Sequence, residues 1–281
     1  MVDILKLFTP VESVNAQEAK TYIDEHEEGS YTLLDVRQPA EYEEARIPGA
    51  KLIPLPQLTD SLDELDPSKP TIVYCAIGGR SRMAAQLLSG KGFNKVYNLK
   101  GGIKAWNGVK AEGPPDLGLE LIAKDQTPED IYILAYGMES VMGDFYRSIA
   151  NQTNDAPLGD LLNQLALIED RHKDYLWQIY QSMKPTDQDS DKLQARANKS
   201  LMEGGLSVDE VLNRYAEYTK NRQDLLDLSM MLETQALDLY LRLGDKVTDE
   251  TSKELLRKIG DEEKGHLASL GRLREESVTK A

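Results

Sequence analysis

The chain has 281 residues, 40% of them hydrophobic, and a net charge of −15 at pH 7. This length and composition predict about two domains with hydrophobic cores. An acidic surface repels phosphate backbones and anionic lipids, so we expect neither nucleic acid nor a membrane as a partner. No apolar run reaches the roughly 18 residues of a membrane helix, and residues 1–20 lack the pattern of a secretory signal. The single cysteine, Cys75, excludes an internal disulfide and favours a reducing, cytoplasmic location.

Residues 1–112 alternate between short β-branched runs and helical stretches. The runs typical of strands are TLLDVR (32–37), TIVYCA (71–76) and KVYNLKGG (95–102). Residues 81–88 have the pattern of a helix. Strands separated by helices predict an α/β domain with a largely parallel sheet. Residues 113–126 contain glycines, a proline pair and charges, so we expect them to form a linker.

From residue 127 the pattern becomes helical, which predicts an all-α domain over 127–281. Helix-start signals are Thr127 before Pro128, Asp155 before Pro157, Ser207 with Glu210, and Thr248 with Asp249 and Glu250. The expected helices lie near 128–151, 157–182, 208–244 and 250–276. Residues 183–205 then form a long connection that includes a short helical piece. Two helical hairpins joined by a long crossover are a known four-helix-bundle topology.

Glutamate and histidine residues of the first hairpin recur in the second at a constant offset of 94 residues. The repeated set is Glu139, Glu169 and His172, followed by Glu233, Glu263 and His266. Each histidine follows a glutamate by three residues, so the two share one helix face. Each hairpin turns midway between its two glutamates, which places them at the same height. Solvated helix faces could explain one such pair, but a gap-free duplication favours a metal site. Carboxylates with imidazoles suit iron or manganese.

This half, over about residues 127–277, resembles the ferritin-like superfamily and specifically its rubrerythrin-like di-iron members. The resemblance implies that the six residues hold two Fe (or Mn) ions, with Glu169 and Glu263 as bridges. Two features depart from rubrerythrins. Met230 and Ala236 stand where an additional carboxylate would lie one turn from Glu233, and no cysteine pair forms a rubredoxin-like module. We therefore expect an external electron donor. By analogy with such bundles, we expect the chain to form a homodimer.

Cys75 ends a strand-like run and opens the loop 75–81 ahead of a helical stretch. The helix N-terminus, the backbone N–H groups around the glycines and the charge of Arg80 all favour a thiolate. The same environment would stabilise a terminal persulfide. The catalytic candidates are Cys75 and Arg80, and the candidate cradle residues are Ala76, Ile77, Gly78, Gly79 and Ser81. The alternative is that Cys75 serves only as a small buried hydrophobe.

Over about residues 5–112 the chain resembles the rhodanese family of sulfurtransferases. The motifs are Leu34-Asp35-Val36-Arg37, Glu41-Tyr42, Ile47-Pro48-Gly49-Ala50, Tyr74-Cys75, Gly79-Arg80-Ser81 and Gly101-Gly102-Ile103-x-Ala105-Trp106. The resemblance implies that Cys75 accepts a sulfane sulfur from a small-molecule donor and passes it to a thiol acceptor. Four residues separate Cys75 from Arg80, whereas rhodanese-like phosphatases have five, so a sulfur-sized pocket is favoured. A single loop cation disfavours the dianion thiosulfate.

Together these patterns predict a two-domain enzyme. The N-terminal α/β rhodanese-like domain would act as a thiosulfate or sulfane sulfurtransferase. The C-terminal ferritin-like bundle would act as a di-iron oxidoreductase or peroxidase on peroxide, O2 or sulfur species. The alternative hypothesis is a sulfur or iron sensor, or a carrier, without turnover.

Overall fold

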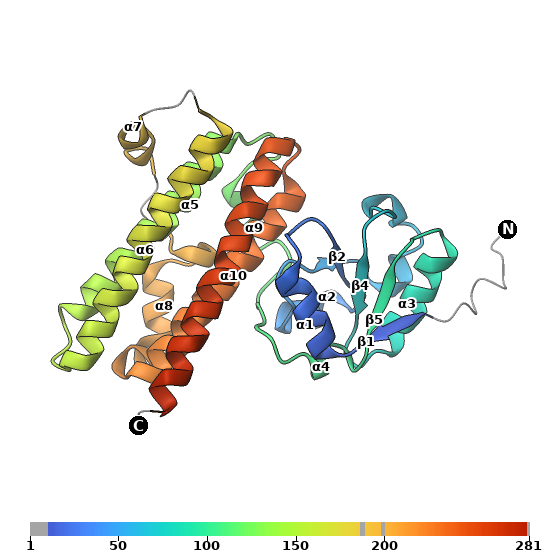
Figure 1. Cartoon of the computed structure of the whole chain (residues 1–281), viewed down its shortest axis with the longest axis horizontal. Helices are drawn as coiled ribbons and strands as arrows, with labels where there is room; N and C mark the ends of the chain where they lie inside the picture. The colour runs from blue at the N-terminus through green and yellow to red at the C-terminus, as the bar shows by residue number, and fades with distance from the viewer. Residues whose placement is uncertain (1–10, 186–188, 198–199, 280–281) are drawn as a thin grey trace. The chain divides into compact units, whose positions relative to one another are not determined.

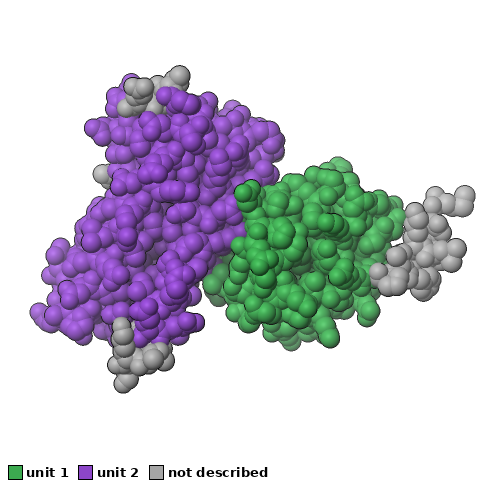
Figure 2. All heavy atoms as spheres, in the orientation of Figure 1, with its two compact units in different colours: residues 1–117 green, residues 118–281 purple. Residues whose placement is uncertain are grey.

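The computed structural model describes residues 11–185, 189–197 and 200–279, and the chain divides into two compact units, Met1–Leu117 and Gly118–Ala281 (Figure 2). Residues 1–10, on which part of the secretory-signal prediction rests, lie outside the described residues. None of the helices described is long and apolar enough to cross a membrane. The first unit is α/β and the second is helical, so the predicted fold classes are confirmed.

The first unit is built on a parallel five-stranded sheet with the order β1-β5-β4-β2-β3 (Figure 1). The strands are β1 (Glu12–Val14), β2 (Thr32–Asp35), β3 (Lys51–Leu52), β4 (Thr71–Tyr74) and β5 (Val96–Leu99). The helices are α1 (Ala16–Glu25), α2 (Pro39–Glu44), α3 (Gly79–Gly90) and α4 (Gly102–Ala105), with short 3-10 turns η2 (Leu55–Gln57) and η3 (Leu62–Glu64). The three strand-like runs and the helix at 81–88 are therefore confirmed.

Alternating strand residues build a separate core on each face of this sheet. Leu34 and Val73 pack in the cluster that contains Ala84 of α3. Leu33 and Ile72, their neighbours along the strands, pack in the cluster with α1, α2 and α4. A buried ion pair braces the end of β2, where Arg37 Nη2 lies 2.6 Å from Asp35 Oδ2. With both faces covered, the free carboxyl end of β4 is left to carry the loop that begins at Cys75.

The second unit contains two helical hairpins, α5–α6 and α9–α10 (Figure 1). Their helices are α5 (Pro128–Ala150), α6 (Ala156–Met183), α9 (Arg222–Lys246) and α10 (Glu250–Thr279), after a 3-10 turn η4 (Leu119–Leu121). The predicted start signals are confirmed, because Thr127 Oγ1 accepts from Asp130 N and Asp155 Oδ1 accepts from Leu158 N. Two apolar clusters fill the bundle.

The connection between the hairpins contains α7 (Ser190–Gln194), the 3-10 turn η5 (Glu203–Gly205), α8 (Val208–Tyr215) and the 3-10 turn η6 (Ala216–Lys220). The prediction of one continuous helix over 208–244 was wrong. Asn221 is extended, with φ −144° and ψ 162°, and its side chain accepts from the N–H of Asp224. This local cap ends one helical segment and begins α9, because an asparagine cap satisfies the N–H groups that a helix start leaves free.

Candidate sulfur-transfer and metal sites

The Cys75 thiol lies directly after β4, and the following loop wraps around its sulfur. Cys75 is 1% exposed, Gly78 N donates to its Sγ at 3.1 Å, and Ser81 Oγ lies 3.5 Å from the same Sγ. Burial raises the pKa of the thiol, but the Ser81 side chain and the N–H groups of Ser81, Ile77 and Gly78 outweigh it, so the pKa is lowered overall. Of the predicted cradle residues, Ile77, Gly78 and Ser81 therefore direct hydrogen-bond donors at the sulfur.

Two glycines make this loop possible. Gly78 has φ +97°, a left-handed conformation that L side chains rarely adopt. Gly102, at the start of α4, has φ +58°, and a Cβ there would lie 2.2 Å from the carbonyl oxygen of Cys75. The close approach allows Ile103 N and Lys104 N to donate to the carbonyl oxygens of Cys75 and Ala76. The backbone beneath the sulfur is therefore fixed by α4, while Ile77 is 66% exposed.

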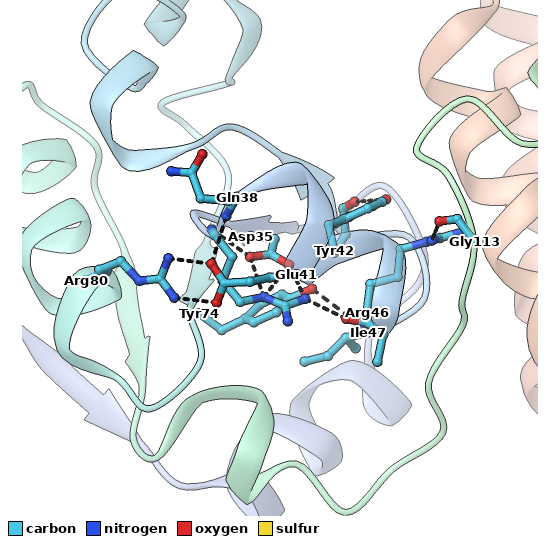
Figure 3. Close-up of polar contacts among 12 residues, drawn as sticks. Asp35, Gln38, Glu41, Tyr42, Arg46, Ile47, Tyr74, Arg80 and Gly113 are labelled. Atoms are coloured by element: carbon cyan, nitrogen blue, oxygen red, sulfur yellow. Dashed lines mark hydrogen bonds and ion pairs between the residues drawn. The ribbon is translucent and has the colours of Figure 1, made fainter.

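The cation of the loop is bound by a carboxylate of α2. Arg80 Nη1 and Nη2 donate to Glu41 Oε2 and Oε1 at 2.7 and 2.6 Å (Figure 3). The Gln38 N–H also donates to Glu41, at 3.1 Å. The two Arg80 hydrogen bonds, chiefly, lower the pKa of Glu41 to about 2. Arg80 thus closes the loop onto α2, and the positive charge that it brings near Cys75 is paired with Glu41, a contact that the sequence did not predict.

The structure brings the six repeated glutamates and histidines into one buried layer across the four helices. All six are at most 7% exposed. His172 Nδ1 lies 2.8 Å from Glu169 Oε2 and 3.4 Å from Glu139 Oε2. In the second hairpin His266 Nδ1 has the matching positions, 3.1 Å from the Glu263 carboxylate and 3.5 Å from that of Glu233. The two imidazole rings stack with centroids 3.2 Å apart, which joins the two copies at the centre.

A seventh side chain, which the sequence analysis missed, enters the same layer from outside the four helices. Glu203, in η5, is 0% exposed. A ligand atom of Glu203 lies within 4.8 Å of those of Glu139 and Glu263, and also of those of Glu169 and Glu233. The one sequence signal was a glutamate next to a glycine pair in an otherwise polar connection.

The layer is electrostatically unbalanced. Burial, and then the neighbouring carboxylates, raise the pKa values of Glu139 and Glu263 well above the ordinary range. Burial lowers the pKa of His266, but the carboxylates of Glu263 and Glu233 outweigh it and raise that pKa. Two imidazoles cannot neutralise five buried carboxylates, so the layer as a whole favours the binding of positive charge.

A pocket of about 210 Å³ borders this layer between α6 and α10. Its wall includes Glu169, His172, Glu233 and His266, and its outer part includes the exposed side chain of Arg171. This volume is below the several hundred Å³ typical of sites for larger ligands. The pocket therefore offers a small molecule a place at the histidine side of the layer.

Two known families match the chain, one over each of the two sites. The rubrerythrin family model matches residues 130–274, and a model described as a rhodanese-like domain matches residues 16–108. The chain belongs to the rubrerythrin family and also carries a rhodanese-like domain. The first domain is thus of the sulfurtransferase type and the second of the di-iron type. The rhodanese-like match contains the Cys75 loop, and the rubrerythrin match contains the Glu–His layer.

Three curated relatives share this sequence in part. An uncharacterized protein, YqhL of Bacillus subtilis, is 43% identical over 97 residues, which are 33% of this chain and 77% of that protein. The putative sulfur carrier protein YrkF of the same organism is 36% identical over 98 residues, or 35% and 52%. A sulfurtransferase of Allochromatium vinosum is 36% identical over 74 residues, or 26% and 69%. The chain therefore spans about half the length of YrkF.

The rubrerythrin domain implies binding of two iron ions, and the buried layer fits such a group. Among the described residues, every buried side-chain nitrogen or oxygen without a hydrogen-bond partner belongs to this layer. These atoms are Glu139 Oε2, Glu169 Oε2, His172 Nδ1, Glu203 Oε1 and Oε2, Glu233 Oε2, Glu263 Oε1 and His266 Nε2. Some of them lie near one another without forming a hydrogen bond, as Glu169 Oε2 and His172 Nδ1 do at 2.8 Å. Unpaired buried acceptors are costly unless a cation binds them. The donor set of carboxylates and imidazoles is also the one that iron and manganese accept.

Proposed function

We propose that the chain is a cytoplasmic sulfurtransferase that carries sulfur as a persulfide on Cys75, linked to a redox reaction at the Glu–His layer. The observation that supports the sulfur-transfer half is the cradle itself. The buried sulfur receives the Gly78 N–H at 3.1 Å at the start of α3, where the helix dipole favours a negative charge. A terminal persulfide sulfur has the same charge as the thiolate, so the same N–H groups would stabilise it.

The transfer would proceed in two displacement steps. The Cys75 thiolate attacks the sulfane sulfur of a donor, a sulfur–sulfur bond forms at Sγ, and the bond between that sulfur and the donor breaks, with the donor leaving as an anion. A thiolate acceptor then attacks the terminal sulfur, the bond to Sγ breaks, and the acceptor leaves as a persulfide. Cys75 returns to a thiolate, so no oxidant or reductant is consumed. The N–H groups of the loop hold the negative charge at each stage.

The charge of the loop supports a donor other than thiosulfate. Thiosulfate carries two negative charges and needs more than one cationic partner to offset desolvation. Arg80 is the one cation of residues 75–81, and Glu41 already binds it through two hydrogen bonds. A low-molecular-weight organic persulfide, whose reacting end carries one negative charge, fits this loop better.

In the second domain we propose that the six repeated residues hold two Fe (or Mn) ions. When bound, such a pair could supply two electrons to peroxide or O2, after which an external donor would restore them, or it could accept two electrons from a sulfur species, after which peroxide or O2 would remove them. The protein contributes the buried carboxylates that bind the ions, the imidazoles stacked at the centre, and the small pocket beside His172 and His266. The pocket supports a substrate of a few atoms. A homodimer is a further expectation that rests on analogy alone.

The sulfur-transfer half is tested by Cys75→Ser in the full chain. Transfer of sulfur from a glutathione persulfide or thiosulfate to cyanide should be lost, because an alcohol at this position cannot form the persulfide. Ser89→Ala, in the last turn of α3, is the control and should retain transfer. Full activity of Cys75→Ser would exclude the assignment, and a higher rate with thiosulfate than with the persulfide would exclude the proposed donor.

The metal half is tested by elemental analysis after anaerobic purification. About two Fe or Mn per chain are expected, and Glu169→Ala or His266→Ala should lose them. The control is Glu254→Ala on α10, whose carboxylate is exposed and pairs with Lys258. Retention of both ions by Glu169→Ala and His266→Ala would refute the site.

Coupling of the two sites is supported by their presence in one chain. The test is the rate of peroxide turnover with and without a sulfane donor, in the wild type and in Cys75→Ser. We expect the donor to change the rate in the wild type alone. Equal rates in all four reactions would show that the sites act independently.

A sensor or carrier without turnover is the second candidate. The similarity to YrkF of Bacillus subtilis, which is named a putative sulfur carrier protein, favours this candidate. Repeated oxidation and reduction of the metal-loaded chain by peroxide and a chemical reductant would exclude it, whereas a single oxidation event per chain would support it.

A further inference from the structure

Glu203 differs from the six repeated residues because it has no counterpart in the other hairpin. It lies in η5, within the connection between α6 and α9, yet its side chain is completely buried. Neither of its carboxylate oxygens has a hydrogen-bond partner in the described part of the chain. Burial, and then the carboxylates of Glu233, Glu263 and Glu169, raise the pKa of Glu203 well above its ordinary range, and His266 opposes them. A cation bound between Glu203 and its neighbours would supply the contact that both carboxylate oxygens lack.

The backbone around Glu203 is built to hold it there. Gly204 and Gly205 have φ of +73° and +78°, and Met202 N donates to Leu206 O at 2.7 Å, which closes a tight loop. A Cβ on Gly204 would lie 2.6 Å from the Cβ of Gln235 and 3.4 Å from the nitrogen of Ala236. The loop therefore rests against α9 one turn beyond Glu233. A glycine is required at 204, because any side chain would push the loop and its glutamate away from the layer.

The position of Glu203 places it between two groups of ligand atoms. Its ligand atom lies within 4.8 Å of those of Glu139 and Glu263 in one group, and of those of Glu169 and Glu233 in the other. Carboxylates can bind one ion or bridge two, so one side chain at this place can reach a metal shared with either hairpin. The four helical glutamates by themselves contribute four negative charges, which balance two divalent ions.

We propose that Glu203 is a seventh ligand residue of the di-metal site, supplied once by the interhelical connection and selective for hard cations such as Fe and Mn. This inference rests on the proposed metal function. With Glu203 the layer has five carboxylates, so the net charge is −1 with two divalent ions and +1 with two trivalent ions. Without Glu203 these charges are 0 and +2. Glu203 therefore stabilises the oxidised pair relative to the reduced pair and lowers the reduction potential of the site.

The experiment compares Glu203→Gln with Glu254→Gln in the full chain. Glu203→Gln keeps the shape of the side chain and removes its charge, whereas Glu254→Gln removes a charge from an exposed pair with Lys258 on α10. Anaerobic Mn2+ titration against a competing chelator measures affinity and stoichiometry, and redox titration of the iron form measures the potential. Glu203→Gln should bind Mn2+ about tenfold or more weakly, because mutation of even a residue that only contacts a metal ligand typically lowers metal affinity about 10–100-fold. Its potential should rise, and Glu254→Gln should match the wild type in both.

A purely structural role would give a different result. Substitution of a residue that only supports the loop should destabilise the metal-free protein, whereas substitution of a metal ligand should not. The unfolding temperature of metal-free Glu203→Gln is therefore expected to equal or exceed that of the wild type. If this variant fails to fold, Glu203→Asp, which keeps the charge on a shorter side chain, should retain both ions with reduced affinity. Wild-type affinity and potential in the variant that folds would refute Glu203 as a ligand. No metal in the wild type would instead refute the metal function itself.

Discussion

Removal of the Ser81 hydroxyl is expected to raise the pKa of the Cys75 thiol. Ser81 Oγ lies 3.5 Å from Sγ and 2.7 Å from Asn98 Oδ1. Burial alone raises the pKa of this thiol, and the Ser81 hydroxyl is the largest of the contacts that lower it. The N–H groups of Gly78, Ile77 and Ser81 stay in place after Ser81→Ala, so the change isolates one donor. The thiolate then loses stabilisation that the neutral thiol scarcely uses.

The structure sets the size of this effect. A hydrogen bond to a charged group contributes about 1.5–3 kcal/mol, and one pKa unit corresponds to about 1.4 kcal/mol. The distance of 3.5 Å is long, and the single hydroxyl proton is shared with Asn98, so the lower end applies. Ser81→Ala should therefore raise the pKa of Cys75 by about one unit.

Alkylation measures this pKa directly. The chain has one cysteine, so the rate of reaction with iodoacetamide as a function of pH reports on Cys75 alone. The rate curve of Ser81→Ala should lie about one pH unit above that of the wild type. The control Ser89→Ala removes a hydroxyl from the last turn of the same helix and should leave the curve in place. A curve for Ser81→Ala that coincides with the wild type, or lies at lower pH, would refute the role of the hydroxyl in the cradle.

Three further predictions concern stability. Gly102→Ala should destabilise the rhodanese-like domain by about 3 kcal/mol or more in urea unfolding, because the new Cβ would lie 2.2 Å from the carbonyl oxygen of Cys75. Gly79→Ala is the control, because a Cβ at residue 79 has no atom within 4 Å, and it should be neutral or stabilising. Glu41→Gln should cost about 0.5–1 kcal/mol at pH 7, since the pair with Arg80 is one-third exposed. The pair stabilises the folded state fully above pH 4.5 and loses this effect as pH falls through about 2. The urea midpoints of the wild type and Glu41→Gln should therefore converge near pH 2. A difference between them that does not change with pH would contradict this. Saturation with Mn2+ at a hundred times Kd should stabilise the bundle by about 2.7 kcal/mol in calorimetry, and a chelator should reverse this; no shift would argue against a metal bound to the folded state.

Local patterns in the sequence predicted the hairpins and the repeated Glu–His set. The spacing of Glu169 and His172 depends only on the helix repeat, and the caps at Thr127 and Asp155 depend on residues three apart. Such features need no knowledge of the tertiary fold. The break at Asn221 was missed because apolar residues continue on both sides of it with helical spacing. Its extended backbone gains the cap to the Asp224 N–H, which a periodicity argument does not consider.

Glu203 and the pairing of Arg80 could not be predicted because they depend on long-range contacts. Glu203 reaches the layer through an irregular loop, and no sequence period relates it to Glu233 or Glu263. Arg80 and Glu41 are 39 residues apart, and only the packing of α2 beside the Cys75 loop brings them together. Both findings change the chemistry. One adds a negative charge to the metal layer, and the other places a carboxylate beside the cation of the sulfur site.

The duplication also explains why the two halves of the bundle are similar but unequal. Tyr146 and Tyr240 are equivalent in the repeat, and both are buried, in different apolar clusters. Tyr146 donates to Ser229 Oγ at 2.9 Å, whereas Tyr240 meets the sulfur of Met138 at 3.8 Å. The ligand layer keeps the symmetry of the repeat in six residues and breaks it at Glu203, which occurs once. If Glu203 binds metal as proposed, the one carboxylate that breaks the symmetry of the repeat lies between both groups of ligand atoms, so its removal should weaken the binding of both ions.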